Sequence, residues 1–322
     1  WLKIGAGAPQ EPGNNRFSMA SGPSSTHDLL DGRKMPGFGL GLFVGDPNSG
    51  HPGSKEARST TSYNAATWAL EMGYRLVDTA ARYQNQESIG RAVRDSGIPR
   101  QEVFVTSKLR RKGYAAALEE GRECVSKLGL GYIDLLMVHS PEGGLLLETW
   151  DAMLELQRQN LVRSLGVANF NKHHIDLLKD NGRPLPVVNQ IQMHPMVYGE
   201  LKELVEYCKE QSILIQAYGS IFCGDVDGLG HPTIKAILGR HRGKTPAQVL
   251  LRWALQAGFA VIPKTVQKHR LQENMDIFDF ELSSTEMDEL NAMGGGKLKH
   301  AYGAGHWNPL DTPLEGSRSS RL

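Results

Sequence analysis

Cysteine is scarce in this chain of 322 residues, and no cysteine spacing suggests a metal or redox site. The three cysteines, Cys124, Cys208 and Cys223, are an odd number and include no Cys-x-x-Cys pair. This argues against a disulfide framework and favours a reducing, cytoplasmic compartment. No histidine or cysteine spacing predicts a metal ion either.

The chain also lacks a charge excess and a long apolar run. Lys and Arg number 36 against 35 Asp and Glu, so no strong field would attract nucleic acid or an anionic membrane. The sequence contains no run of about 18 apolar residues, the length that a membrane-spanning helix needs. The expected partner is therefore a small molecule. For the assembly state, we expect a monomer or a weak dimer.

The first part of the chain carries little signal for regular structure. Residues 1–26 are rich in Gly, Pro, Asn and Ser, and we interpret them as a leader, a cloning remnant or a disordered arm. Residues 27–322 are expected to form one domain that includes a C-terminal tail, since single α/β barrels commonly occupy about 250 residues.

A β-hairpin is expected at the start of this domain. Asp31-Gly32 lies between Leu29-Leu30 and Lys34-Met35 and suits a two-residue turn that needs positive φ angles. Short runs rich in Val, Ile and Leu then alternate with longer amphipathic segments. The runs predict eight strands, at 38–43, 75–79, 103–108, 133–139, 162–168, 187–192, 213–218 and 260–264. The amphipathic segments predict helices such as 62–72, 87–94, 115–128, 147–159, 201–211 and 247–256.

This alternation predicts the fold class. Apolar strands that alternate with helices indicate a parallel sheet covered by helices, and eight such units predict a closed (β/α)8, or TIM, barrel. An open, doubly wound sheet is the alternative. It would need a phosphate-binding glycine turn after an early strand, and the glycines of 37–41 do not fit that motif, while those of 5–7 lie in the arm. The glycines of 294–296 do not form a P-loop.

Polar or ionisable residues lie at the ends of seven of the eight expected strands. Barrel enzymes place their chemistry at the C-terminal ends of the strands, so these residues should share one rim. They are, in chain order, Asp78 with Tyr83 shortly after it, Lys108, His139, Asn169, Gln190, Tyr218 and Lys264.

Four of these residues suggest a proton donor. Asp78 and Lys108 on neighbouring strands can form an ion pair, with Tyr83 above them. An ordinary tyrosine titrates near pH ~10, and we expect the nearby ammonium to lower that value and make Tyr83 a usable acid. His139 can align a substrate oxygen. This group lacks a nucleophile and suits protonation of an oxygen while hydride reaches the attached carbon.

Each of the four also has a plain structural interpretation. Asp78 and Lys108 can be an ordinary rim ion pair, Tyr83 a loop aromatic and His139 a satisfied core histidine, because structural ion pairs also perturb pKa values. Their common position at one rim favours the catalytic interpretation.

Several motifs resemble the aldo-keto reductase family. The segment from Asp78 to Gly90 resembles the signature D-T-A-x-x-Y-x-N-E-x-x-[IV]-G, with Gln86 in place of its Glu. Segments 106–109, 134–141, 187–195 and 262–274 resemble the family in the same order, and the likeness covers roughly residues 28–300. It implies a TIM barrel that uses NADPH to reduce aldehydes and ketones to alcohols.

The resemblance assigns roles by position. It implies that Tyr83 is the general acid, activated by Lys108 and Asp78, and that His139 orients the carbonyl. A larger set is implied to bind NADPH. Asn169 and Gln190 hold the nicotinamide carboxamide, Tyr218 stacks against the nicotinamide ring, and cations bind the adenosine 2′-phosphate. This set comprises Leu42, Phe43, Asn169, Gln190, Tyr218, Gly219, Ser220, Ile221, Asp225, Lys264, Thr265, Val266, Arg270, Glu273 and Asn274.

Some positions depart from the family pattern. Ala168 and Gly219 stand where serines often contact the cofactor. Phe43 and Ser140, with Tyr83 and His139, are expected to border the substrate, and the absence of a tryptophan after His139 implies a roomy pocket. The C-terminal tail is expected near the same rim.

Two other functions remain open. The fold also occurs in noncatalytic accessory or structural proteins, which can bind cofactor without turnover. Family members that reduce carbon-carbon double bonds typically have Glu in place of His139. Retention of all four residues disfavours the first alternative, and His139 disfavours the second.

Overall fold

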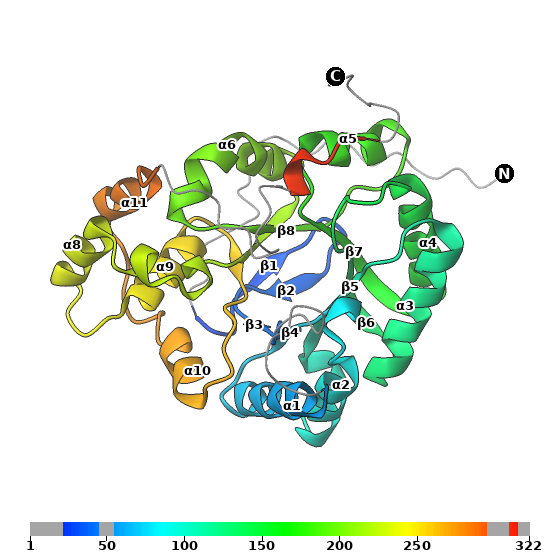
Figure 1. The fold of residues 1–322 in the computed structure, drawn as a ribbon, viewed down its shortest axis with the longest axis horizontal. Helices are drawn as coiled ribbons and strands as arrows, with labels where there is room; N and C mark the ends of the chain where they lie inside the picture. Colours follow the sequence, from blue (N-terminus) through cyan, green and yellow to red (C-terminus); the bar gives the residue numbers. More distant parts are fainter. Residues whose placement is uncertain (1–21, 45–54, 295–308, 315–322) are drawn as a thin grey trace.

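The computed structural model describes residues 22–44, 55–294 and 309–314, and an eight-stranded parallel sheet lies at its centre (Figure 1). Neighbours in the sheet are neighbours in the sequence, and each strand lies in or beside a range that the sequence predicts. The strands are β3 (Leu40–Gly41), β4 (Leu76–Asp78), β5 (Phe104–Leu109), β6 (Ile133–Val138), β7 (Val162–Ala168), β8 (Val188–Gln192), β9 (Leu214–Tyr218) and β10 (Ala260–Val261).

The sheet closes through the backbone of its first and last strands. The N–H of Gly39 donates to the carbonyl of Val261 at 2.9 Å, and that of Gly41 to Pro263 at 3.1 Å. A Cβ atom on Gly41 would lie only 2.8 Å from the carbonyl oxygen of Ile262, so the close approach of the first and last strands requires a glycine here. This closure confirms the predicted (β/α)8 barrel, and it gives the early glycines a structural role.

Helices surround the barrel (Figure 1), and some of them start at a side-chain cap. Thr245 with Gln248, and Ser283 with Glu286, form capping boxes that satisfy the first free N–H groups of their helices. The α-helices are α1 (Lys55–Glu71), α2 (Gln86–Asp95), α3 (Tyr114–Leu128), α4 (Leu146–Arg158), α5 (Lys172–Asp180), α6 (Pro195–Glu210), α7 (Val226–Leu229), α8 (Pro232–Arg240), α9 (Pro246–Gln256), α10 (Lys268–Met275) and α11 (Ser284–Asn291). Short 3₁₀ turns occur at η1 (Ala81–Tyr83), η2 (Arg100–Glu102), η3 (Phe222–Gly224) and η4 (Pro309–Asp311).

The expected N-terminal hairpin is present, but its turn is longer than predicted. Strands β1 (Thr26–Asp28) and β2 (Lys34–Pro36) pair antiparallel, with Asp28 opposite Lys34. Leu29 also pairs with Arg33, which leaves a three-residue loop with Gly32 at φ 81°. The two-residue turn was therefore wrong. Only Gly32 has a positive φ in this loop, as is usual in three-residue hairpins.

This hairpin contributes to the apolar interior of the barrel. Leu29 and Met35 join a buried cluster with side chains from the barrel strands, including Leu76, Phe104 and Leu135. A second, larger cluster fills the space between the strands and the surrounding helices. The hairpin and this apolar interior lie at the N-terminal ends of the strands, so the polar groups of the barrel gather at the opposite end.

The described part of the C-terminal tail, residues 309–314, lies against α5 (Figure 1). The carbonyl oxygen of Thr312 is 2.7 Å from Nε2 of His174 and 3.0 Å from Nε2 of His173. Because α5 follows β7, this contact brings the tail to the predicted rim. Residues 1–21 of the expected arm, and tail residues 295–308 and 315–322, lie outside the described residues.

Two helical glycines provide a test of this packing. A Cβ atom on Gly90 of α2 would lie 1.8 Å from the carbonyl oxygen of Leu128, whereas one on Gly199 of α6 would meet no atom within 4 Å. Gly90→Ala should therefore lower the free energy of unfolding by about 3 kcal/mol or more. Gly199→Ala, the control, should leave it unchanged or raise it by up to about 1 kcal/mol. Urea unfolding checks both, and equal effects would contradict the close packing of α2 on α3.

Candidate active site

The centre of the site is a buried ion pair between two neighbouring strands. Nζ of Lys108, on β5, lies 2.5 Å from Oδ1 of Asp78, at the end of β4, and the two side chains are 0% and 3% exposed. Lys108 also donates to the carbonyl oxygen of Thr79 at 3.1 Å. A buried pair is stabilised by further hydrogen bonds to its charged groups, and these two contacts use two of the three ammonium hydrogens of Lys108.

Tyr83 lies over this pair. It belongs to η1, directly after β4, and its ring centroid lies 5.1 Å from the ammonium nitrogen of Lys108. The ring also lies 5.7 Å from that of His139 in an edge-on arrangement, and 5.0 Å from that of Phe43. The four residues expected to act together are thus adjacent at the C-terminal ends of the strands.

The ionisation of Tyr83 differs from the sequence expectation. Burial raises the pKa of its phenol well above the usual value, the negative charge of Asp78 raises it further, and Arg82 opposes both. The expected lowering by Lys108 was wrong, because that ammonium lies 2.5 Å from a carboxylate that offsets its charge. Tyr83 therefore remains a neutral hydroxyl donor at neutral pH.

His139 is also neutral at neutral pH. Burial lowers the pKa of its imidazole well below the usual value, and the nearby charges of Lys108, Lys112 and Arg82 add to this shift. A neutral imidazole keeps one N–H donor and one acceptor nitrogen. The rim thus combines two neutral donors, a phenol and an imidazole, with one ammonium.

Three further residues lie at the ends of the following strands. Asn169, just after β7, donates from Nδ2 to the carbonyl oxygen of His139 at 3.0 Å. Its Oδ1 accepts the hydroxyl of Tyr218 at 2.8 Å. Gln190 on β8 donates from Nε2 to Oδ2 of Asp78 at 2.9 Å. Asn169 and Gln190 are therefore hydrogen-bonded directly to members of the tetrad (Asp78, Tyr83, Lys108 and His139), and Tyr218 is linked to it through Asn169.

The loop after β9 has an unusual backbone. Gly219, Phe222, Cys223 and Gly224 all have positive φ angles. Ser220 is buried, whereas the other expected cofactor residues of this loop, Ile221 and Asp225, are half-buried.

The expected phosphate and adenine residues lie around β10 and α10. Lys264 and Arg270 are exposed, and neither forms an ion pair within the described parts of the chain. Thr265 is buried, and Val266 is half-buried. At the other expected positions, Oε1 of Glu273 accepts the hydroxyl of Thr245 at 2.7 Å, and Asn274 is buried.

Three expected contact residues face different environments. The side chain of Leu42 is fully buried in the core, so only its backbone can face a ligand. Phe43 is half-buried beside Tyr83. Ser140 is half-buried, and its carbonyl oxygen accepts a hydrogen bond from Lys112.

The sequence interpretation overlooked two residues near the tetrad. Gln216 on β9 is fully buried, and its Oε1 accepts from Nε2 of Gln190 at 2.6 Å. It stands two residues before Tyr218, so the alternation of side chains along a strand was a usable signal. Lys112 follows β5, and burial lowers its pKa to about 8. Its place in a basic run, Arg110-Arg111-Lys112, did not distinguish it from a solvent-exposed charge.

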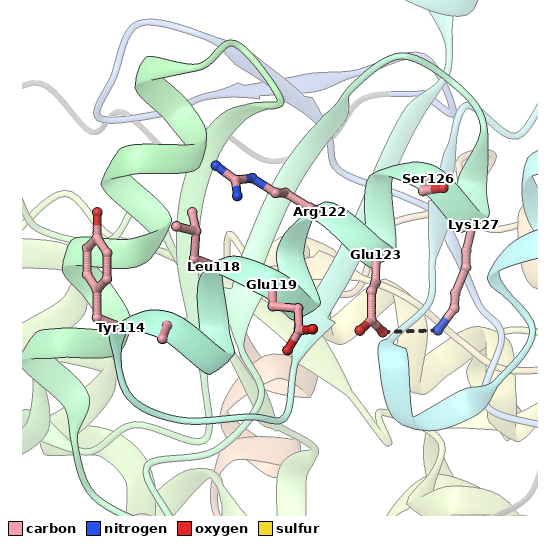
Figure 2. Close-up of a pocket in the computed structure, with 8 residues that line it drawn as sticks. Tyr114, Leu118, Glu119, Arg122, Glu123, Ser126 and Lys127 are labelled. Carbon is pink, nitrogen blue, oxygen red and sulfur yellow. Dashed lines mark hydrogen bonds and ion pairs between the residues drawn. The ribbon is translucent and has the colours of Figure 1, made fainter.

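A separate surface hollow lies on α3, away from the tetrad (Figure 2). All of its lining residues belong to that one helix, among them Tyr114, Leu118 and Arg122. Glu123 and Lys127 form an exposed pair there at 3.3 Å. This hollow does not bring groups from several strands together, and we do not assign the chemistry to it.

The fold and the site together define a TIM-barrel oxidoreductase. A model of the aldo/keto reductase family matches residues 48–294, and the chain belongs to that family. The chain is 37% identical to glyoxal reductase of Bacillus subtilis (strain 168), over 85% of this chain and 95% of the relative. It is 35% identical to methylglyoxal reductase of Escherichia coli (strain K12), over 84% and 93%.

A solved structure supports the same conclusion. The aldo-keto reductase of Bombyx mori in complex with NADP superposes with a TM-score of 0.74, at 32% identity over 84% of this chain and 93% of that one. These comparisons confirm the predicted family, enzyme class and cofactor type.

Two kinds of feature are absent from the described residues. No group of His, Cys, Asp and Glu side chains among them is arranged to hold a metal ion. No helix among them is long and apolar enough to cross a membrane.

The buried histidines predict how stability depends on pH. Burial lowers the pKa of His27, His174 and His194 to about 4 each, and that of His139 well below its usual value. Below pH 6.5 the unfolded chain therefore binds more protons than the folded one. The free energy of unfolding should fall from pH 6.5 to pH 4.5, by at least about 1 kcal/mol per pH unit.

Urea unfolding at several pH values measures this slope. His194→Phe should reduce it, whereas replacement of the exposed His269 by Phe should not. A flat profile in the unmodified protein would show that these imidazoles titrate normally.

Proposed function

We propose that the protein reduces aldehydes and ketones to alcohols with NADPH, and that Tyr83 is the proton donor. The observation that supports this most directly is the convergence of Tyr83 and His139 on the buried pair of Asp78 and Lys108. The names of relatives make glyoxal and methylglyoxal the first substrates to test.

The described residues fit the cofactor. Oε1 of Gln190 and one amide hydrogen of Asn169 have no partner among the described residues, and both lie beside the tetrad. Lys264 and Arg270 supply cations that have no carboxylate partner among the described residues, which suits a 2′-phosphate. Bound NADPH supplies the hydride for the carbonyl carbon.

Each tetrad residue then has a defined task. Tyr83 transfers its hydroxyl proton to the carbonyl oxygen, and its raised pKa keeps that proton in place before the reaction. Lys108 stabilises the phenolate that remains, and Asp78 holds Lys108 charged and oriented. His139, as a neutral donor, hydrogen-bonds the same oxygen and aligns it.

The noncatalytic alternative predicts cofactor binding without turnover. Cofactor binding alone would not require the buried ammonium of Lys108 and the neutral imidazole of His139 beside the phenol of Tyr83. Reduction of a carbon-carbon double bond is disfavoured because a neutral His139, with no carboxylic acid in its place, faces Tyr83.

Removal of the Tyr83 hydroxyl tests the proton donor. Tyr83→Phe should lower kcat for methylglyoxal at least about 100-fold, since a general acid contributes about that much, while the Kd for NADPH stays the same. Tyr63→Phe is the control, because it removes a phenol that bonds Asp95 on the outer helices. Turnover by Tyr83→Phe at the normal rate would refute the mechanism.

Removal of a cation tests the choice of cofactor. Arg270→Ala should weaken NADPH binding about tenfold or more and leave NADH binding nearly unchanged, because only NADPH carries the 2′-phosphate. Calorimetric titration with both cofactors measures this. Arg242→Ala removes another exposed cation and should change neither affinity. Equal losses for both cofactors in Arg270→Ala would place the phosphate site elsewhere.

A further inference from the structure

Gln190 uses both hydrogens of its amide on the protein. Nε2 donates to Oδ2 of Asp78 at 2.9 Å and to Oε1 of Gln216 at 2.6 Å. Asp78, paired with the ammonium of Lys108, can only accept hydrogen bonds. The Gln190 atom that faces it must therefore be nitrogen, and the Gln216 atom that faces this nitrogen must be oxygen. The assignment of nitrogen and oxygen in both amides follows from the carboxylate.

This arrangement leaves Gln190 with one free polar atom, its Oε1. No described residue donates to that oxygen. The neighbouring Asn169 is left with the opposite capacity, because its Oδ1 accepts from Tyr218 and one of its Nδ2 hydrogens goes to His139. Its second hydrogen remains. Gln190 and Asn169 thus offer one acceptor and one donor, which together complement a primary carboxamide.

Gln216 makes this arrangement at the expense of its own hydrogen bonding. The side chain is fully buried, and its Nε2 has no hydrogen-bond partner among the described residues. A buried donor without a partner destabilises the folded state, and an apolar side chain of the same shape would avoid that loss. The only hydrogen bond that Gln216 gains through its side chain within the described chain is the one to Gln190.

We propose that Gln216 is a positioning residue for the nicotinamide site. Asp78 holds one amide hydrogen of Gln190, and Gln216 holds the other, which decides whether Gln190 presents its oxygen or a hydrogen to the ligand. Gln216 anchors this second amide hydrogen, so that Oε1 is presented to the cofactor as an acceptor. The site then favours a ring substituent that donates a hydrogen bond. This inference rests on the proposed function, because it takes Gln190 as a cofactor contact.

Two cofactor analogues test the polarity. The thionicotinamide analogue of NADP+ keeps the NH2 donor, whereas the 3-acetylpyridine analogue replaces that NH2 with a methyl group. The unmodified protein should bind the acetylpyridine analogue about tenfold more weakly than NADP+, because Oε1 of Gln190 loses its donor. The thionicotinamide analogue should bind within about threefold of NADP+. Calorimetric titration gives both ratios.

Gln216→Met tests the anchor. Without Gln216, the second amide hydrogen of Gln190 loses its acceptor and can turn toward the ligand. The carbonyl oxygen of the acetylpyridine analogue then gains a hydrogen-bond donor on Gln190, whereas the NH2 group of NADP+ loses its acceptor. The tenfold preference for NADP+ should fall to about threefold or less. The preference is a ratio within one variant, so a general loss of affinity cancels. Thr106→Val is the matched control, since it removes another buried polar atom without a partner on a barrel strand, and it should keep the preference.

The outcomes separate this inference from the proposed function. If the unmodified protein binds NADP+ but binds the acetylpyridine analogue equally well, the polarity is wrong, whatever the variants do. An unchanged preference in Gln216→Met overturns the role of Gln216 alone. If NADP+ itself does not bind, the proposed function fails before the inference is reached.

Discussion

The site depends on one electrostatic constraint, the buried pair of Asp78 and Lys108. Two charges without access to water need further hydrogen bonds, and here Thr79 supplies one to the ammonium and Gln190 one to the carboxylate. Asp78 accepts from Lys108 with one oxygen and from Gln190 with the other. The same carboxylate therefore orients the ammonium under Tyr83 and the amide beside the cofactor site.

Through such shared contacts, the functional groups at the C-terminal ends of the strands are linked to one another. Lys108 connects to Tyr83, Gln190 connects to Gln216, and Asn169 connects His139 to Tyr218. The result is a set of groups whose donor and acceptor roles are fixed before any ligand arrives. Preorganised dipoles of this kind favour the transition state because they need little rearrangement during the reaction.

The neutrality of Tyr83 also follows from the pair. Burial dominates the pKa of the phenol, and the charge of Asp78 raises it further, while the ammonium of Lys108 is paired with that same carboxylate. An unpaired lysine would have favoured the phenolate, which is the wrong form for donating a proton. The carboxylate thus protects the acid form of Tyr83 as well as the position of Lys108.

The sequence by itself determined the barrel and most of the rim. Strand and helix periodicity fixes which segments alternate, and a parallel barrel brings all strand ends to one face, so Asp78, Lys108, His139 and Gln190 could be placed from their positions alone. Only the tertiary structure decided the turn length of the hairpin, which depends on register, and the role of Gln216, which depends on one contact between strands. It also decided the direction of the Tyr83 pKa, because burial and the distance between two other charges set it. These properties arise from distances between residues far apart in the chain, and the order of the residues does not specify such distances.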